Sequence, residues 1–180
     1  MPHTPSPATT ARSSIVFIRG RKTVLRPLEK ADATALAVIA NHPDVRQYIA
    51  VFLPQSVEAE ERWVNEQVKG DEHNIVFGVE TLTSRQLIGV MGIHHIRWTD
   101  GTAATGAIFH PDHCGKGYGT DAKLYLLQYA FDTLGLRKVC SSAIAFNERS
   151  IRYSIRCGYR VECRRRKQFF RNGKLLDEVL

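Results

Sequence analysis

Three glycines alternate at positions 115, 117 and 119, in the run GKGYGT. Glycine has no Cβ, so a backbone of this kind can turn sharply and come close to a ligand. If a helix starts just after the loop, successive amide hydrogens point into one concavity at its positive end, which favours phosphate oxygens. Lys116 and the Thr120 hydroxyl are further candidate contacts. The segment therefore predicts a phosphate-binding loop.

The spacing does not fit the two best-known phosphate loops. A Walker loop needs G-x-x-x-x-G-K-[ST], and here the residue before Thr120 is a glycine. A dinucleotide loop needs G-x-G-x-x-G near the start of a βαβ unit, whereas this G-x-G-x-G follows predicted antiparallel strands. For the loop taken alone, a glycine-rich turn without a ligand is the alternative interpretation.

The elements that must position this loop can be predicted from periodicity and caps. Runs rich in β-branched and aromatic residues predict strands at 15–18, 23–27, 74–80, 87–98, 102–110, 138–145, 159–171 and 174–180. Helical patterns predict helices at 33–40, 57–69, 120–134 and 147–156, with Asp32, Ser56 and Asn147 as caps. This order predicts an α/β fold with a mostly antiparallel sheet.

Composition narrows the class of protein. The 180 residues favour one domain, at 14–180, after a leader at 1–13 that is rich in Pro, Thr and Ser. The leader lacks the apolar stretch of a signal peptide and no run is long enough to span a membrane, so a cytoplasmic protein is expected.

The four cysteines lack the spacing of a zinc site, which predicts free thiols and no metal. A net charge of +7 suits an anionic partner without choosing among nucleic acid, a membrane surface and a phosphate-bearing cofactor.

Four segments resemble the GNAT superfamily of acetyltransferases. The run from Cys114 to Gly119 resembles the family motif [RQ]-x-x-G-x-[GA], and 147–159 resembles its N-x-x-S-x-x-x-x-x-x-x-G-[FY] block. The runs 25–28 and 170–177 are similar to the ribosomal-protein N-terminal acetyltransferase (RimJ/RimL-like) branch. The resemblance covers 14–180 and implies the GNAT fold, an α/β (α+β) fold. In this fold a central, mostly antiparallel twisted sheet of about seven strands is flanked by helices, and a splayed strand pair holds the cofactor.

The resemblance implies acetyl-CoA as cofactor, with CoA as product. The amides of the glycine loop would hold the pyrophosphate, the strand edge before the loop would pair with the pantetheine arm, and Asn147 would bond the arm from the other side, although Asn147 as a helix cap alone is the alternative. The implied cofactor-binding residues are Ala107, Ile108, Phe109, Gly115, Lys116, Gly117, Tyr118, Gly119, Thr120 and Asn147. The chain departs from the family at Cys114, where Arg or Gln is usual, and at Ala104, where a carboxylate is common.

The resemblance also implies direct attack of a neutral amine on the acetyl thioester, without a covalent enzyme intermediate. The tyrosine that acts as general acid in many relatives falls on Ser154, so the hydroxyl of Ser154 or Ser150 is the candidate proton donor. Candidate acceptors of the amine proton are His94, His95 and Glu80, with water relay to solvent an equal alternative. Adjacent strand residues face opposite sides, so at most one of the two histidines should face the cleft.

The acceptor implied first is a protein or peptide N-terminal amine, and small amines such as polyamines and aminoglycosides are the alternative. The acceptor is expected between 41–53 and the last hairpin, and the family implies a homodimer. Two other classes remain: a CoA-binding module without catalysis, and a nucleic-acid-binding protein. The basic run Arg164–Lys167 is the best nucleic-acid feature, but a strand would split its charges between two faces, and that interpretation leaves the glycine loop unexplained.

Overall fold

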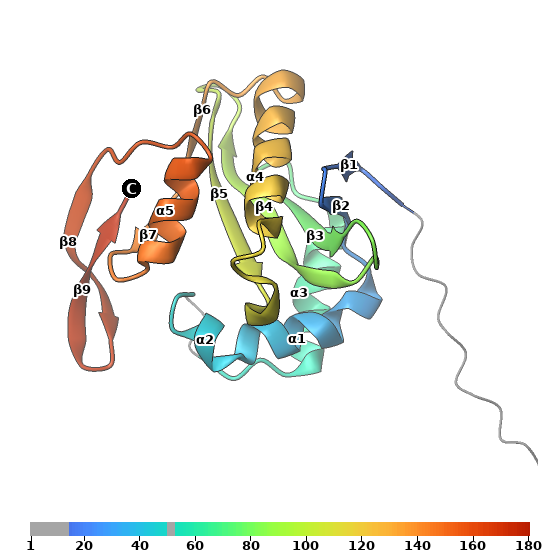
Figure 1. Ribbon diagram of the computed structural model, residues 1–180, viewed down its shortest axis with the longest axis horizontal. Helices are drawn as coiled ribbons and strands as arrows, with labels where there is room; N and C mark the ends of the chain where they lie inside the picture. Colours follow the sequence, from blue (N-terminus) through green and yellow to red (C-terminus); the bar gives the residue numbers. More distant parts are fainter. Residues whose placement is uncertain (1–14, 50–52) are drawn as a thin grey trace, which may run out of the picture.

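The computed structural model describes residues 15–49 and 53–180, which form two sheets flanked by helices (Figure 1). The expected leader lies outside the described residues. The larger sheet has six strands in the order β1-β2-β3-β4-β5-β6. Their bounds are β1 Ile18–Arg19, β2 Thr23–Pro27, β3 Ile75–Thr81, β4 Leu87–Arg97, β5 Thr102–Phe109 and β6 Lys138–Cys140. Neighbouring strands from β1 to β5 are antiparallel, whereas β6 runs parallel to β5.

A smaller sheet has the order β7-β9-β8 and is built from β7 (Ala143–Ile144), β8 (Arg164–Arg171) and β9 (Lys174–Val179). The prediction of one strand over 138–145 was therefore wrong, because β6 and β7 belong to different sheets. Two serines separate them, and the Ser141 hydroxyl donates to the carbonyl of Thr105 at 3.4 Å. A short hydroxyl side chain of this kind competes with regular strand pairing. The described residues thus form nine strands in two sheets, where about seven in one sheet were expected.

Five α-helices accompany the sheets: α1 Ala33–Asn41, α2 Pro43–Arg46, α3 Val57–Lys69, α4 Tyr118–Gln128 and α5 Glu148–Arg156. Ser56 and Asn147 cap α3 and α5 as predicted, each accepting a backbone amide at 3.1 Å. Asp32 is the N-cap residue of α1 as predicted, but its side chain makes no capping hydrogen bond, because its carboxylate accepts from the Arg26 guanidinium and the Glu29 amide instead. Helix α4 begins two residues earlier than expected and continues as a π-helical turn over Tyr129–Thr133.

The main core lies between the larger sheet and α4. Met91 and Ile93 of β4 pack there with Ala122 and Leu126 of α4. Val90, on the opposite face of β4, joins a second cluster that includes residues of α1 and α3. This alternation is the period of two that a strand buried on both faces requires, and each fully buried side chain contributes roughly 1.5–3 kcal/mol. The core therefore fixes α4, and with it the glycine loop at its N-terminus, against the sheet.

The pairing of β5 with β6 is short. It joins Thr102 to Lys138, Ala103 to Val139 and Ala104 to Cys140. Beyond Ala104 the two strands separate, and the part of β5 from Thr105 to Phe109 has no strand beside it on that side among the described residues. The divergence has the form of the splayed pair that the family resemblance implies.

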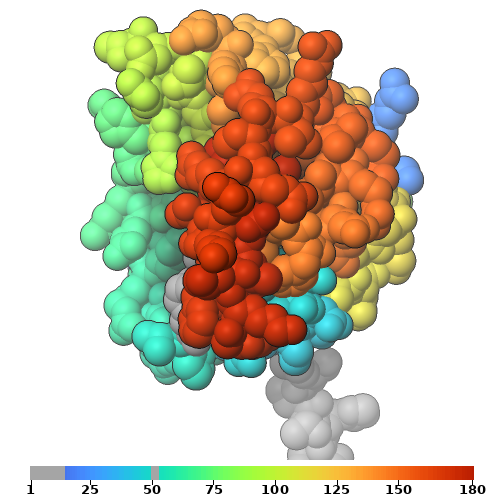
Figure 2. Space-filling model, turned by 90° about the vertical axis from the view of Figure 1, so that its left-hand side faces the viewer, coloured from blue at the N-terminus to red at the C-terminus, as the bar shows by residue number. Residues whose placement is uncertain are grey.

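The β8–β9 hairpin extends along one side of the molecule (Figures 1 and 2). Its lower end lies near the segment that follows α2, where Arg171 Nη2 donates to the carbonyl of Ile49 at 3.5 Å. The basic run on β8 meets acidic partners on β9, since Arg164 pairs with Asp177 and Arg165 with Glu178. Within 15–49 and 53–180, none of the helices has the length and apolar character needed to cross a membrane.

Candidate active site

A cavity of about 460 Å³ lies beside the free edge of β5. Its walls are β5, the glycine loop, α5 and the end of α2. The lining residues are Val45, Tyr48, Ile49, Ala107, Ile108, Phe109, His113, Cys114, Gly115, Gly117, Gly119, Thr120, Asn147, Arg149, Ser150, Tyr153 and Arg156. Eight of the ten residues implied for the cofactor are among them; Lys116 and Tyr118 are not. We call this space the cofactor cavity.

The glycine loop has the backbone shape of an anion site. Gly115 and Gly117 have φ values of 76° and 86°, a region that costs other residues roughly 1–2 kcal/mol. Gly117 is also the N-cap of α4 and offers no side chain to cap it. The first amides of a helix have no intrahelical acceptor, so these are available to a ligand. A pyrophosphate group fits this arrangement, in which backbone amides and the helix dipole both favour negative charge.

A cation that the sequence interpretation missed also reaches the loop. Lys22, in the turn between β1 and β2, donates from Nζ to the Lys116 carbonyl at 3.2 Å. Asp121 in the first turn of α4 holds this turn in place, because its carboxylate accepts the backbone amides of Lys22 and Thr23, each at 3.0 Å. About a hundred residues separate the two partners, so no local spacing could have indicated the contact.

The wall opposite β5 comes from α5. Asn147 Oδ1 accepts the Ser150 amide as the helix cap, and both residues line the cofactor cavity. Capping and a contact with the cofactor's arm are therefore compatible roles for Asn147. Tyr153, one turn further along, lines the same wall and donates from its hydroxyl to the Gly119 carbonyl at 3.2 Å. Tyr153 lies three residues after Ser150, and residues three apart share a face of a helix. This spacing could have predicted that Tyr153 lines the same cavity as Ser150.

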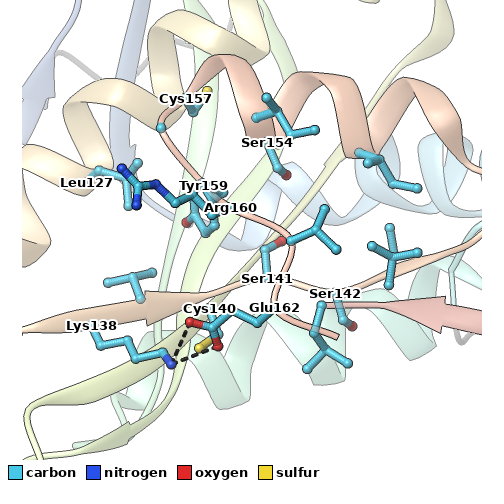
Figure 3. Close-up of a pocket in the computed structure, with 18 of the residues that line it drawn as sticks. Leu127, Lys138, Cys140, Ser141, Ser142, Ser154, Cys157, Tyr159, Arg160 and Glu162 are labelled. Atoms are coloured by element: carbon cyan, nitrogen blue, oxygen red, sulfur yellow. Dashed lines mark hydrogen bonds and ion pairs between the residues drawn. The ribbon is translucent and has the colours of Figure 1, made fainter. Parts of the chain in front are cut away.

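Ser154 lies elsewhere. It lines a second cavity of about 410 Å³ between α5 and β6, together with Leu127, Cys140 and Tyr159 (Figure 3). The residues of α5 that line the cofactor cavity are Arg149, Ser150, Tyr153 and Arg156 instead. The sequence alignment correctly placed Ser154 on α5, but the helix turns its side chain away from the cofactor cavity. Of the two serines, Ser150 is the one placed to act there.

Neither candidate histidine lines the cofactor cavity, and their side chains have different surroundings. His94 is half-buried, and its ring lies over Gly92 and Gly106, where a Cβ on Gly92 would come within 2.6 Å of Nε2. Gly106 belongs to the part of β5 beyond the pairing with β6. Burial, together with the charges of His95 and Lys123, lowers the pKa of His94, so the ring is neutral at pH 7 and able to accept a proton. His95 is exposed, with a φ of 53° where the β4–β5 register shifts.

Glu80 is not placed to act as a base. It is buried, and both of its carboxylate oxygens are occupied, one by Arg26 Nε and the other by Arg85 Nε, each at 2.6 Å. Glu80 also lies outside the lining of the cofactor cavity. The structure does not favour Glu80 as a base. Its strand position showed only which way the side chain points, whereas the partners that hold it come from β2 and from the turn after β3.

Comparisons with known proteins agree with this geometry. The model of the acetyltransferase (GNAT) domain family matches residues 22–160. The uncharacterized N-acetyltransferase YoaA of Bacillus subtilis (strain 168) is 24% identical over 156 residues, which is 86% of this chain and 88% of that protein. The spermidine N(1)-acetyltransferase of Vibrio cholerae is 26% identical over 153 residues, which is 85% of this chain and 87% of that protein.

Solved structures give the same result. The spermidine N-acetyltransferase from Vibrio cholerae in complex with CoA and spermine has a TM-score of 0.80 at 25% identity, covering 88% of this chain and 92% of that one. A GNAT-family acetyltransferase from Bacillus anthracis has a TM-score of 0.79 at 25% identity, covering 91% and 95%. None of these relatives carries the name of the expected RimJ/RimL-like branch. The chain belongs to the GNAT family and is an acetyl-CoA-dependent N-acetyltransferase.

Proposed function

We propose that this enzyme acetylates a primary amine that carries little positive charge beyond the reacting nitrogen, with a peptide or protein N-terminal amine as the first candidate. One observation carries this choice: among the described residues that line the cofactor cavity, none is Asp or Glu, whereas Arg149 and Arg156 are both present. A polycation entering beside two guanidinium groups would meet like charge with no carboxylate to offset it.

The acceptor end of the cavity supports the same choice. Tyr48 lies there against Phe146, with ring centroids 5.3 Å apart, and the Arg149 guanidinium lies 5.8 Å from the centre of the Tyr48 ring. Arg171 of the hairpin reaches the same segment through the Ile49 carbonyl. Aromatic faces and guanidinium groups suit the carbonyl and carboxylate groups of a peptide better than a chain of ammonium groups.

In this mechanism the chain binds the cofactor, orients the two reactants and transfers protons. Bound acetyl-CoA supplies the acetyl thioester. The amides of residues 115–120 hold the pyrophosphate, and the β5 edge at 107–109 aligns the arm like an added strand. Holding both reactants in one cavity replaces a bimolecular encounter and can contribute several kcal/mol. Neutral His94, outside the cavity lining, accepts the proton of the amine through water, and the Ser150 hydroxyl is the candidate proton donor to the departing thiolate.

Polyamine acetylation is the second candidate function. The observation in its favour is the similarity to the Vibrio cholerae enzyme named for spermidine, whose structure contains CoA and spermine.

The test is release of free thiol from acetyl-CoA with a panel of amines. The panel pairs a peptide with its N-terminally blocked form, in acidic, neutral and basic sequences, and adds spermidine and an aminoglycoside. We expect release with free N-termini, strongest for the least basic peptides. Release with spermidine alone would overturn the peptide proposal, and saturable CoA binding without release from any of these amines would overturn both the peptide and the polyamine candidates. Gly117→Trp should abolish release, while Gly135→Trp is the control, since Gly135 has a similar φ of 67° and open space around it.

A further inference from the structure

A lysine is buried at the point where β5 and β6 separate. Lys123 of α4 is only 1% exposed and points towards β5, where its Nζ donates to Thr105 Oγ1 at 2.7 Å. The rings of Tyr153 and Tyr159 flank it, with their centroids 5.5 Å and 5.2 Å from Nζ. Within the described part of the chain, no carboxylate lies within ion-pair distance of this ammonium. Burying a charge in this way is costly, so a lysine at this position needs a reason.

Thr105 is the residue through which Lys123 can act. It is the first residue of β5 beyond the pairing with β6. Its carbonyl accepts the Ser141 hydroxyl at 3.4 Å, and its own hydroxyl lies 2.8 Å from the Tyr159 hydroxyl as well as 2.7 Å from Lys123. Four segments therefore meet at Thr105: β5, α4, the residues after β6 and the residues after α5.

The same cluster separates the two cavities. Tyr159 and Cys157 line the second cavity (Figure 3), whereas Tyr153 lines the cofactor cavity and donates to the Gly119 carbonyl in the glycine loop. Lys123 lies between these two tyrosine rings. It thus connects the strand edge that would hold the cofactor's arm with the loop that would hold its pyrophosphate.

We propose that Lys123 is a positioning residue for acetyl transfer: its ammonium fixes Thr105 at the apex of the splayed strands, and so fixes the β5 edge on which the cofactor's arm lies. The inference rests on the proposed function of the cofactor cavity. In the rest of the sheet, pairing with a neighbouring strand holds each strand in place. Beyond Ala104 the β5 edge lacks such a neighbour, and here the buried ammonium of Lys123 holds it.

The proposal implies a pH dependence. The titratable groups beside Lys123 are Tyr153, Cys157 and Tyr159, from α5 and the residues after it. His94 lies on the other face of β4, over Gly92, and interacts with Lys123 only through its charge. Burial lowers the pKa of Lys123 to about 8, against a smaller raising effect of Cys157. The side chain is therefore mostly an ammonium at pH 7 and mostly a neutral amine above pH 9. A neutral amine makes a weaker hydrogen bond to Thr105, because it loses the assistance of charge.

The test compares Lys123→Met with the natural chain. Methionine keeps the length of the side chain but has no ammonium, and Lys69→Met, on the exposed last turn of α3, is the matched control. We expect Lys123→Met to lower kcat/KM for acetyl-CoA about tenfold at neutral pH, the loss that corresponds to one charge-assisted bond. The ratio of kcat/KM between the natural chain and the variant should then fall towards one as pH rises past about 8, because Lys123 loses its charge there. Ionisation of the acceptor amine is common to both proteins and cancels in the ratio.

Thr105 supplies the second arm. Thr105→Val removes the hydroxyl and should lose activity like Lys123→Met, while Thr105→Ser keeps the hydroxyl and should lose less. The double variant Lys123→Met with Thr105→Val should lose no more than either single variant, since both remove one interaction. A ratio that stays constant with pH, or losses that multiply in the double variant, would overturn the proposal and leave Lys123 with a packing role only.

Failure of the proposed function gives a different result. If the natural chain releases no thiol with any amine, the proposed function fails, and the affinity for CoA becomes the readout for Lys123. The Met variant should then bind CoA about tenfold more weakly at neutral pH, with the same convergence at high pH. Equal CoA affinity of the two proteins at every pH would overturn the role of Lys123 by itself.

Discussion

Arg26 and Glu80 form an ion pair between β2 and β3, with Nε 2.6 Å from Oε1 and both side chains almost completely buried. The other side of the Arg26 guanidinium binds Asp32 in a fork, with Nη1 and Nη2 at 2.8 Å and 2.7 Å from the two carboxylate oxygens. Arg85 binds the remaining oxygen of Glu80. This network joins two strands to the start of α1 and gives Glu80 a structural role rather than a catalytic one.

Glu80→Gln should therefore destabilise the fold while leaving the chemistry unchanged. Removing the Glu80 charge leaves Arg26 and Arg85 with only the Asp32 carboxylate in the network, and breaking a buried ion pair costs up to about 3–5 kcal/mol. Denaturant unfolding should show this loss in the free energy of unfolding. The pH dependence of kcat/KM, measured at a temperature where the variant stays folded, should keep its shape. Loss of a pH limb together with near-natural stability would instead return Glu80 to the list of candidate bases.

Lys123→Met should make the protein more stable at neutral pH, although it slows the enzyme. The pKa of Lys123 is about 8 in the folded chain against 10.5 for the free side chain, so the unfolded chain binds more protons between these values and stability rises with pH across that window. At pH 7 the natural chain carries the full free-energy cost of burying the ammonium, about 3 kcal/mol. The Met variant avoids this cost but loses the bond to Thr105, which is worth about 1 kcal/mol.

The difference in stability between the natural chain and Lys123→Met can be measured by thermal or denaturant unfolding of both proteins near pH 7 and above pH 10. The advantage of the Met variant should be about 2 kcal/mol at neutral pH and should disappear at high pH. A variant that is less stable at neutral pH would show that the ammonium is well compensated where it lies. A gain in stability coupled to a loss in kcat/KM would indicate a site that is strained for function.

Gly117→Ala and Gly135→Ala form a matched pair for the glycine loop. Both glycines have positive φ values, 86° and 67°, so each substitution should cost roughly 1–2 kcal/mol of stability. A Cβ on Gly117 would lie 3.2 Å from Lys22 Nζ and alter the N-cap of α4, whereas nothing lies within 4 Å of a Cβ on Gly135. We expect only Gly117→Ala to raise KM for acetyl-CoA, about tenfold, in steady-state kinetics. An equal rise in both variants would mean that general strain, rather than the loop, controls cofactor binding.

The sequence predicted those features of the fold that depend on local chemistry. Alternating glycines before a helix, Ser56 and Asn147 as caps, and the strand-forming run of β4 each follow from a few neighbouring residues, and the structure has them. The division between β6 and β7 was not predictable in this way. It depends on the Ser141 hydroxyl meeting a carbonyl 36 positions earlier, which no window of sequence contains.

The candidate site shows the same limit. The cofactor loop was found because its amides act as one local unit. Ser154 was assigned from a motif position, but the rotation of α5 about its axis decides which cavity a side chain enters, and packing sets that rotation. Lys123 was missed because a lysine on a helix is normally solvated, and its burial depends on Thr105 and on tyrosines at 153 and 159 coming together from distant segments.

His94→Gln tests whether His94 accepts the proton of the amine. Burial lowers its pKa below the ordinary value, so kcat/KM of the natural chain should fall at acid pH as the ring gains a proton. The acceptor amine also gains a proton at low pH, so the profile should be measured with two acceptors whose amines differ in pKa. A limb of the pH profile that shifts with the pKa of the amine reports ionisation of the acceptor, and a limb that stays in place reports ionisation of the enzyme.

We expect His94→Gln to remove the stationary limb and lower kcat/KM about a hundredfold. His95→Gln, at the exposed neighbour, should keep both limbs. If the stationary limb survives in His94→Gln, the proton leaves through water instead, because His95 is exposed and the carboxylate of Glu80 is held by Arg26 and Arg85.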